Sequence, residues 1–268
     1  MEDDFKSRSR RVLGDAGLAK LEAATVAVLG LGGVGSSCAE ALARGGIGTL
    51  ILIDRDRVAP SNINRQALAF RSTIGREKAE VMAAMICDID PDIRTFVSTA
   101  FVRESAFTET AGYTPLDLDV PERSVSAVLE SFPRPEFIVD AVDTITTKLA
   151  LARYAQDAGI PIVASMGGAN KTDPTALRFA DLYDTVNCPL CRSMRKTARN
   201  RGIERLPVLY SCEAPVKVAA EAGAQRRERT ELGTMSYYPP IMGQMLASYV
   251  IRELLEPGSV TLQGQTTS

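Results

Sequence analysis

Carboxylates close two strongly apolar segments of this chain. Asp54 ends the run at residues 49–54 and is followed by Asp56, while Asp140 and Asp143 stand in the run at residues 137–143. If both runs are strands of an open α/β sheet, these acids lie at its carboxyl edge, where such sheets bind ligands. A carboxylate there can accept hydrogen bonds from a ribose or hold Mg²⁺ beside phosphates.

A glycine-rich turn precedes the first pair of acids. Gly30, Gly32, Gly33 and Gly35 satisfy the spacing G-x-G-x-x-G between an apolar run and a helical pattern. Such a turn lets backbone amides approach a phosphate at the positive end of the following helix. Asp54 follows at about the distance at which a carboxylate contacts the ribose of a dinucleotide. Together these features predict a site for an adenine nucleotide.

Cations and amides near the acids favour a triphosphate over NAD. The segment Asn62-Ile-Asn64-Arg65-Gln66 brings a guanidinium and three amides to the carboxyl end of the second predicted strand. Lys78 lies about one turn into a helix predicted at residues 75–89, where its ammonium can reach a phosphate. This cluster can donate hydrogen bonds to three phosphates, whereas an NAD site has no evident use for it.

The absence of histidine limits the chemistry. The 268 residues contain no histidine, which excludes Ser-His-Asp and Cys-His nucleophiles and zinc sites with imidazole ligands. Catalysis must therefore use carboxylates, lysine, arginine, cysteine, backbone amides or a bound cation.

The elements that position these residues follow a β-turn-α-β order. Continuous apolar runs predict buried parallel strands at 25–30, 49–54, 137–143 and 161–165, with a further strand at 94–100. Helices are expected at 5–24, 36–44, 75–89, 148–158 and 241–255, and a helix with loops at 103–135. This order predicts a Rossmann-like, doubly wound, mostly parallel sheet with a smaller C-terminal extension.

Composition places the chain among ordinary globular proteins. We expect a nucleotide-binding core at 1–175 and an extension at 176–268 that packs on it and contributes to substrate and dimer contacts. The formal net charge is −2, and no apolar run reaches the length of a membrane span. The N-terminus lacks the pattern of a signal peptide, so a cytoplasmic setting without membrane association is expected.

The combined motifs resemble the E1-like ThiF/MoeB/HesA superfamily of adenylating enzymes. The resemblance implies an ATP-dependent enzyme that attaches AMP to a carboxylate, with ATP on the glycine turn and its ribose on Asp54. It also implies that Asn64, Arg65 and Lys78 contact phosphates and that Asp143 holds Mg²⁺. Arg8 matches an arginine that reaches the ATP of the partner subunit in these enzymes, which implies a homodimer.

One further segment narrows the resemblance. Residues 165–175 follow the fifth predicted strand and place small residues, an amide and a cation at the mouth of the sheet. Together with the match over residues 8–174, this segment resembles the bacterial tRNA threonylcarbamoyladenosine dehydratases. The implied substrate is a tRNA whose modified adenosine is adenylated on its carboxylate and then cyclised. The basic stretch 192–205 fits contact with an RNA backbone, although a solvated helix face explains it too.

Two other functions stay open. An adenylyltransferase for the C-terminus of a ubiquitin-like sulfur carrier would often hold a zinc ion on two Cys-x-x-Cys pairs, but here only Cys212 follows Cys188-Pro-Leu-Cys191. We expect no structural zinc and no thioredoxin-like redox pair, because the two cysteines are not expected to begin a helix after a strand. Cys212 remains a candidate thioester nucleophile. The third function is a non-catalytic nucleotide-binding module.

Overall fold

The computed structural model describes residues 4–103, 122–214, 216 and 233–263. Its strands are β1 (Thr25–Leu29), β2 (Thr49–Ile53), β3 (Arg94–Ser98), β4 (Phe101–Arg103), β5 (Glu122–Ser124), β6 (Phe137–Asp140), β7 (Ile162–Ser165), β8 (Leu177–Asp181) and β9 (Pro207–Ser211). Its α-helices are α1 (Ser7–Ala23), α2 (Gly33–Gly45), α3 (Lys78–Ile89), α4 (Val125–Leu129), α5 (Ile145–Ala158), α6 (Pro189–Asn200) and α7 (Tyr238–Leu255).

Seven strands form one sheet in the order β3-β2-β1-β6-β7-β9-β8. All neighbouring pairs are parallel except β8 with β9, which are antiparallel. The chain builds outward from β1 to β2 and β3, then returns to the other side of β1 with β6. The strand order therefore reverses between β1 and β6, and a ligand crevice is expected at the carboxyl ends of these strands. The predicted doubly wound, mostly parallel sheet is confirmed.

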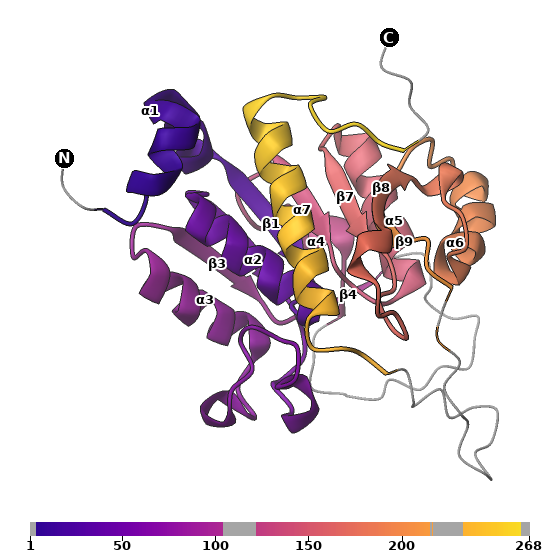
Figure 1. Cartoon of the computed structure of the whole chain (residues 1–268), viewed down its shortest axis with the longest axis horizontal. Coiled ribbons are helices and arrows are strands. Elements are labelled where there is room, and N and C mark those ends of the chain that lie inside the picture. Colours follow the sequence, from indigo (N-terminus) through magenta and orange to yellow (C-terminus); the bar gives the residue numbers. More distant parts are fainter. Residues whose placement is uncertain (1–3, 104–121, 215, 217–232, 264–268) are drawn as a thin grey trace.

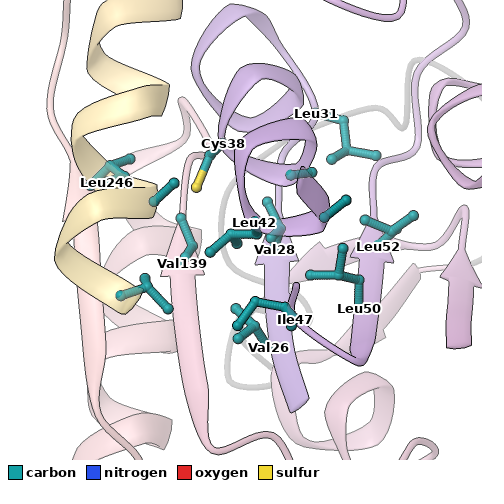
Figure 2. Packing of buried hydrophobic residues seen from close by; sticks show 14 of the residues in the cluster. Val26, Val28, Leu31, Cys38, Leu42, Ile47, Leu50, Leu52, Val139 and Leu246 are labelled. Atoms are coloured by element: carbon teal, nitrogen blue, oxygen red, sulfur yellow. The ribbon is translucent and has the colours of Figure 1, made fainter. Parts of the chain in front are cut away.

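Helices cover both faces of the sheet (Figure 1). On one face, α2 and α7 lie side by side with α3 beside them, and on the other face α5 and α6 pack with α4. Every residue of β1 and β2 is buried, because their alternate side chains enter both apolar layers. Figure 2 shows part of the first layer, where Val28, Leu42 and Leu246 meet between the sheet and two helices.

The segment after residue 176 adds to the same sheet and core. Strands β8 and β9 extend the sheet, and α7 packs against α2 next to the glycine turn. Gly243 of α7 allows this close packing, because a Cβ there would lie 2.4 Å from the carbonyl oxygen of Val34. Helix α7 thus stabilises the position of α2 and the glycine turn.

One helix begins later than predicted. Helix α3 starts at Lys78 instead of residue 75, so Lys78 is its first residue. The reason lies in the preceding residues, which pair with an earlier segment: Gly75 donates to the carbonyl of Val58 at 2.8 Å, and Glu77 forms a bridge with Arg57. Of the region 103–135, residues 104–121 lie outside the described part, and the expected helix is α4.

Within the described ranges, none of the helices combines the length and apolar character that crossing a bilayer requires.

Candidate functional site

A cavity of about 410 Å³ opens at the carboxyl ends of β1, β2 and β6. It therefore lies at the point where the strand order reverses. Its lining brings together the glycine turn, the acids after β2 and β6, and the cationic segment. Among the residues that line it are Gly30, Gly32, Gly33, Asp54, Arg55, Asp56, Asn62, Arg65, Gln66, Lys78, Asp143, Thr147, Gly168, Ala169, Thr234 and Pro239.

The glycine turn requires the absence of side chains at two positions. Gly30 has φ of +84°, and a Cβ on it would lie 2.7 Å from the carbonyl oxygen of Ala141. A Cβ on Gly35 would lie 1.7 Å from the carbonyl oxygen of Gly30, so Gly35 serves the turn and does not line the cavity. Helix α2 begins at Gly33 and has no side-chain cap. Its first amides are thus available to an anion.

Asp54 is held at the start of the loop that follows β2. Its carboxylate accepts hydrogen bonds from the backbone amides of Leu31 and Asp56, the latter at 2.8 Å. Burial raises the pKa of Asp54, and the charge of Lys78 opposes this rise. A carboxylate has about four acceptor positions, so the two amides leave capacity for a ribose hydroxyl.

Lys78 and Arg65 bring positive charge to the cavity from two segments. The Nζ of Lys78 lies 2.9 Å from Oδ2 of Asp56, and the Lys78 side chain is 6% exposed. Arg65 donates to the carbonyl of Ser61 at 3.0 Å and to Oδ1 of Asn64 at 2.8 Å. Asn64 does not line the cavity; its amide group bonds Arg65 and the carbonyl of Thr234.

Gln66 carries an unsatisfied polar atom at this site. The residue is 7% exposed and lines the cavity, and its Oε1 has no hydrogen-bond partner among the described residues. Leaving a buried polar group without a partner costs about 1–3 kcal/mol. A polar ligand in the cavity would supply the missing partner.

The two acids of the fourth predicted strand have different surroundings. Asp143 is exposed and lines the cavity, as expected of a metal-holding group. Asp140, which the sequence also offered for Mg²⁺, is fully buried and its Oδ1 lies 3.1 Å from the Nζ of Lys148. Asp140 does not line the cavity, because its carboxylate is paired within the protein core, and Asp143 alone stays the predicted metal-holding acid. Burial raises its pKa, and the Lys148 charge opposes the rise.

The rest of the cavity lining comes from more distant parts of the chain. The expected small residues are present as Gly168 and Ala169, but Lys171 does not line the cavity and donates instead to the carbonyl of Glu213. Thr234 and Pro239 were not predicted. They carry no motif, and only the packing of α7 against α2 places them here.

Other predicted residues lie outside the cavity. Arg8 is exposed on α1 and does not line it, and its predicted contact with a partner's ATP stays a prediction. The cysteine pair begins a helix, although not one that directly follows a strand: Cys188 is the N-cap residue of α6 and Cys191 lies in its first turn. A 3-10 turn at Leu182–Asp184, rather than a strand, precedes them in the chain.

The donor set of the cavity fits a nucleotide with a divalent cation. The uncapped start of α2 and the cations of Arg65 and Lys78 line this space. The unpaired Oε1 of Gln66 and the exposed carboxylate of Asp143 belong to the same lining. Within the described residues, no group of three or more acids and cysteines could hold a metal ion. A single carboxylate is nevertheless typical of Mg²⁺ that is bound mainly through phosphates and water.

Comparison with known proteins finds one matching family model, similar sequences and a similar solved structure. The ThiF family model matches residues 6–268. The tRNA threonylcarbamoyladenosine dehydratase of Bacillus subtilis is 33% identical over 93% of this chain and 94% of its own length. The Escherichia coli dehydratase TcdA, solved in complex with ATP, superposes with a TM-score of 0.76 at 29% identity, covering 92% of each chain. The SAMP-activating enzyme E1 of Haloferax volcanii is 28% identical over 56% of this chain and 48% of its own.

Proposed function

This chain belongs to the ThiF family, and on that basis we propose that it adenylates the carboxylate of N6-threonylcarbamoyladenosine in tRNA and cyclises the modification. The observation that carries the proposal is the cavity itself. It gathers the glycine turn, Arg65 and Lys78 opposite Asp143, in a chain similar to dehydratases over nearly its full length. This arrangement suits three phosphates and a metal better than a nicotinamide.

The proposed reaction has two steps. The carboxylate of the modified nucleoside attacks the α-phosphorus of ATP, and pyrophosphate leaves. The neighbouring carbamoyl group then attacks the activated carbonyl carbon, and AMP departs with one former carboxylate oxygen. The nucleoside thus loses the elements of water while ATP becomes AMP and pyrophosphate. The second step is intramolecular, so positioning alone supplies much of the acceleration, and no histidine base is required.

Each side chain of the cavity has a role in this proposal. The amides at the start of α2 and the carboxylate of Asp54 bind the phosphates and the ribose. Arg65 and Lys78 stabilise the negative charge that develops on the α-phosphate and on departing pyrophosphate. Gln66 offers its buried amide to the nucleotide. Asp143 would hold Mg²⁺, which when bound neutralises phosphate charge.

The tRNA contact is proposed to include α6, in the segment 176–268. Arg192, Lys196 and Arg199 are exposed on this helix, and Arg199 stacks on the ring of Tyr183, 4.9 Å from its centroid. Arg195 is excluded from this surface, because it donates to the carbonyl and hydroxyl of Thr185 at 2.8 and 2.7 Å. The exposed cations can neutralise phosphates of an RNA backbone.

We also propose a homodimer in the cytoplasm, in which Arg8 of each subunit reaches the nucleotide of the other. Two features support it. Arg8 lies on the exposed side of α1, and Val12, one turn later, is 83% exposed. An apolar side chain this exposed beside a cation fits a surface covered by a second copy.

A second candidate function is adenylation of a small carrier protein. The partial similarity to a SAMP-activating enzyme E1 favours it. In this case the C-terminal carboxylate of the carrier, rather than a modified nucleoside, would enter the cavity.

Product analysis distinguishes these functions. The purified protein is incubated with ATP, Mg²⁺ and either tRNA carrying threonylcarbamoyladenosine, the same tRNA without the modification, or a carrier protein. We expect AMP and pyrophosphate to form in equal amounts with modified tRNA alone, and the nucleoside to lose the mass of one water. Release driven by the carrier but not by tRNA would reject the first function. ATP binding without any AMP release would leave a nucleotide-binding module.

A further inference from the structure

The cysteine pair at the start of α6 has no role in the proposed reaction. Cys188 is the N-cap residue, and its Sγ accepts a hydrogen bond from the backbone amide of Cys191 at 3.5 Å. Cys188 is 7% exposed, whereas Cys191 is completely buried in the apolar layer beneath α6. Of the two residues, Cys188 therefore keeps a small exposed fraction and Cys191 keeps none.

The two thiols have opposite acidities. A hydrogen bond from the Cys191 thiol lowers the pKa of Cys188 to about 6, and the amides of Cys191 and Leu190 and the charge of Lys171 act in the same direction. Sharing its proton with Cys188 and burial both raise the pKa of Cys191, while nearby Arg195 opposes the rise. The pair thus combines a readily ionised thiol on a residue that is 7% exposed with a protonated thiol on a fully buried residue.

This arrangement suits redox exchange better than metal binding. Within the described residues, no cluster of three or more potential ligands surrounds a metal position. Cys212, the next cysteine along the chain, directs its Sγ toward the carbonyl of Ala176 at 3.3 Å. A low-pKa thiolate at a helix N-terminus followed by a buried thiol in the same turn is the arrangement of a reactive dithiol.

We propose that Cys188 and Cys191 form a reversible dithiol–disulfide centre that is oxidised by small disulfides of the glutathione class. The Cys188 thiolate attacks one sulfur of oxidised glutathione, and the first glutathione leaves as a thiolate. Cys191 then loses its proton and attacks the Cys188 sulfur of the mixed disulfide, releasing the second glutathione. Two electrons pass from the cysteines to glutathione, and one S–S bond replaces another.

The small exposure of Cys188 sets the class of oxidant. Cys188 is 7% exposed as a residue, so a small molecule can approach it more readily than a folded protein can. The centre also adjoins the cavity: Leu190 lies 3.9 Å from the position of a Cβ on Gly167, and the next residues, Gly168 and Ala169, line the cavity.

Thiol mapping tests the proposal without relying on the proposed function. The reduced protein is incubated with excess oxidised glutathione, quenched in acid, unfolded and alkylated. The tryptic peptide at residues 179–192 contains Cys188 and Cys191 and no other cysteine. We expect neither cysteine of this peptide to be alkylated, and its mass to be lower than that of the reduced, unalkylated peptide by two hydrogens. Dithiothreitol should make both cysteines available to alkylation again.

Variants assign the two roles. Cys191→Ser should stop at a stable glutathione adduct on Cys188, and Cys188→Ser should prevent the reaction, while serine still caps the helix. Cys87→Ser removes an exposed thiol on α3 and should leave the oxidation unchanged. Two alkylated cysteines after oxidation, or a disulfide between Cys188 and Cys212 instead, would overturn the proposal.

Discussion

The Nζ of Lys148 lies 3.1 Å from Oδ1 of Asp140, and both side chains are at most 1% exposed. The same Oδ1 accepts a hydrogen bond from the amide of Val142 at 3.1 Å. Three residues after Asp140, Asp143 is exposed in the cavity. One short segment thus carries an acid that is paired in the protein core and an acid that lines the cavity, and mutation can separate their effects.

Asp140→Ala should destabilise the protein, whereas Asp143→Asn should inactivate it. Removing Asp140 leaves the buried ammonium of Lys148 unpaired, which costs about 3–5 kcal/mol in the free energy of unfolding. Asp143 is exposed, so its replacement should change that free energy by less than about 0.5 kcal/mol. Urea denaturation and AMP release measure the two effects. An active Asp143→Asn enzyme would contradict the assignment of the metal-holding acid.

Lys78→Met should abolish turnover and leave the fold intact. The substitution keeps most of the aliphatic volume, and the acid left behind, Asp56, is 55% exposed and stays hydrated. Loss of a group that stabilises charge in the transition state lowers kcat by about 10²–10³-fold. Lys20→Met on α1 serves as the matched control, since Lys20 is exposed and far from the cavity lining. Equal kcat values for the two variants would argue against the role of Lys78.

Asp54→Asn should change how stability depends on pH. Burial raises the pKa of Asp54 above 3.8 in the folded protein, so the folded state holds this proton more tightly than the unfolded state. The native protein therefore loses stability, relative to the Asp54→Asn variant, as the pH rises from 3.8 through the raised pKa of Asp54. We expect the free energy of unfolding of Asp54→Asn minus that of the native protein to increase across this window. Denaturant titrations at several pH values measure this difference. A difference that falls as the pH rises would contradict a raised pKa of Asp54 in the folded protein.

Replacing exposed cations of α6 should weaken tRNA binding in a salt-dependent way. Arg192→Ala and Lys196→Ala should each reduce the slope of log K against log salt concentration by about 1, if each neutralises one phosphate. Arg44→Ala is the control, because Arg44 is exposed on α2 and paired with Glu40. Filter binding over a salt series gives the slopes. Unchanged slopes in both α6 variants would place the tRNA elsewhere.

Complementation tests the role of Arg8 across the subunit interface. Arg8→Ala and Asp143→Asn should each be inactive alone. After the two are mixed and allowed to exchange subunits, half of the dimers are mixed, and each has one complete site, so about a quarter of native activity should return. AMP release before and after exchange measures this. A mixture that stays inactive despite subunit exchange would mean that Arg8 does not act in the partner's site.

The sequence predicted the half of the site that local motifs build. Strand β1, the glycine turn, Asp54 and Lys78 lie within about 50 residues of one another, and burial and turn geometry fix their relation. Thr234 and Pro239 were missed, because long-range packing of α7 brings them to the cavity and they carry no recognisable motif. The sequence also did not reveal that Asp140 is buried and paired with Lys148, since this depends on how the core packs.

The central claim is that one crevice holds the three phosphates of ATP between a cationic segment and an acid. A crystal structure with a non-hydrolysable ATP analogue and Mg²⁺ tests it most directly. We expect adenosine near Asp54, the phosphates between Arg65 and Lys78, and the metal on Asp143. Density for the analogue elsewhere, or preferential binding of NAD in the same crevice, would contradict it.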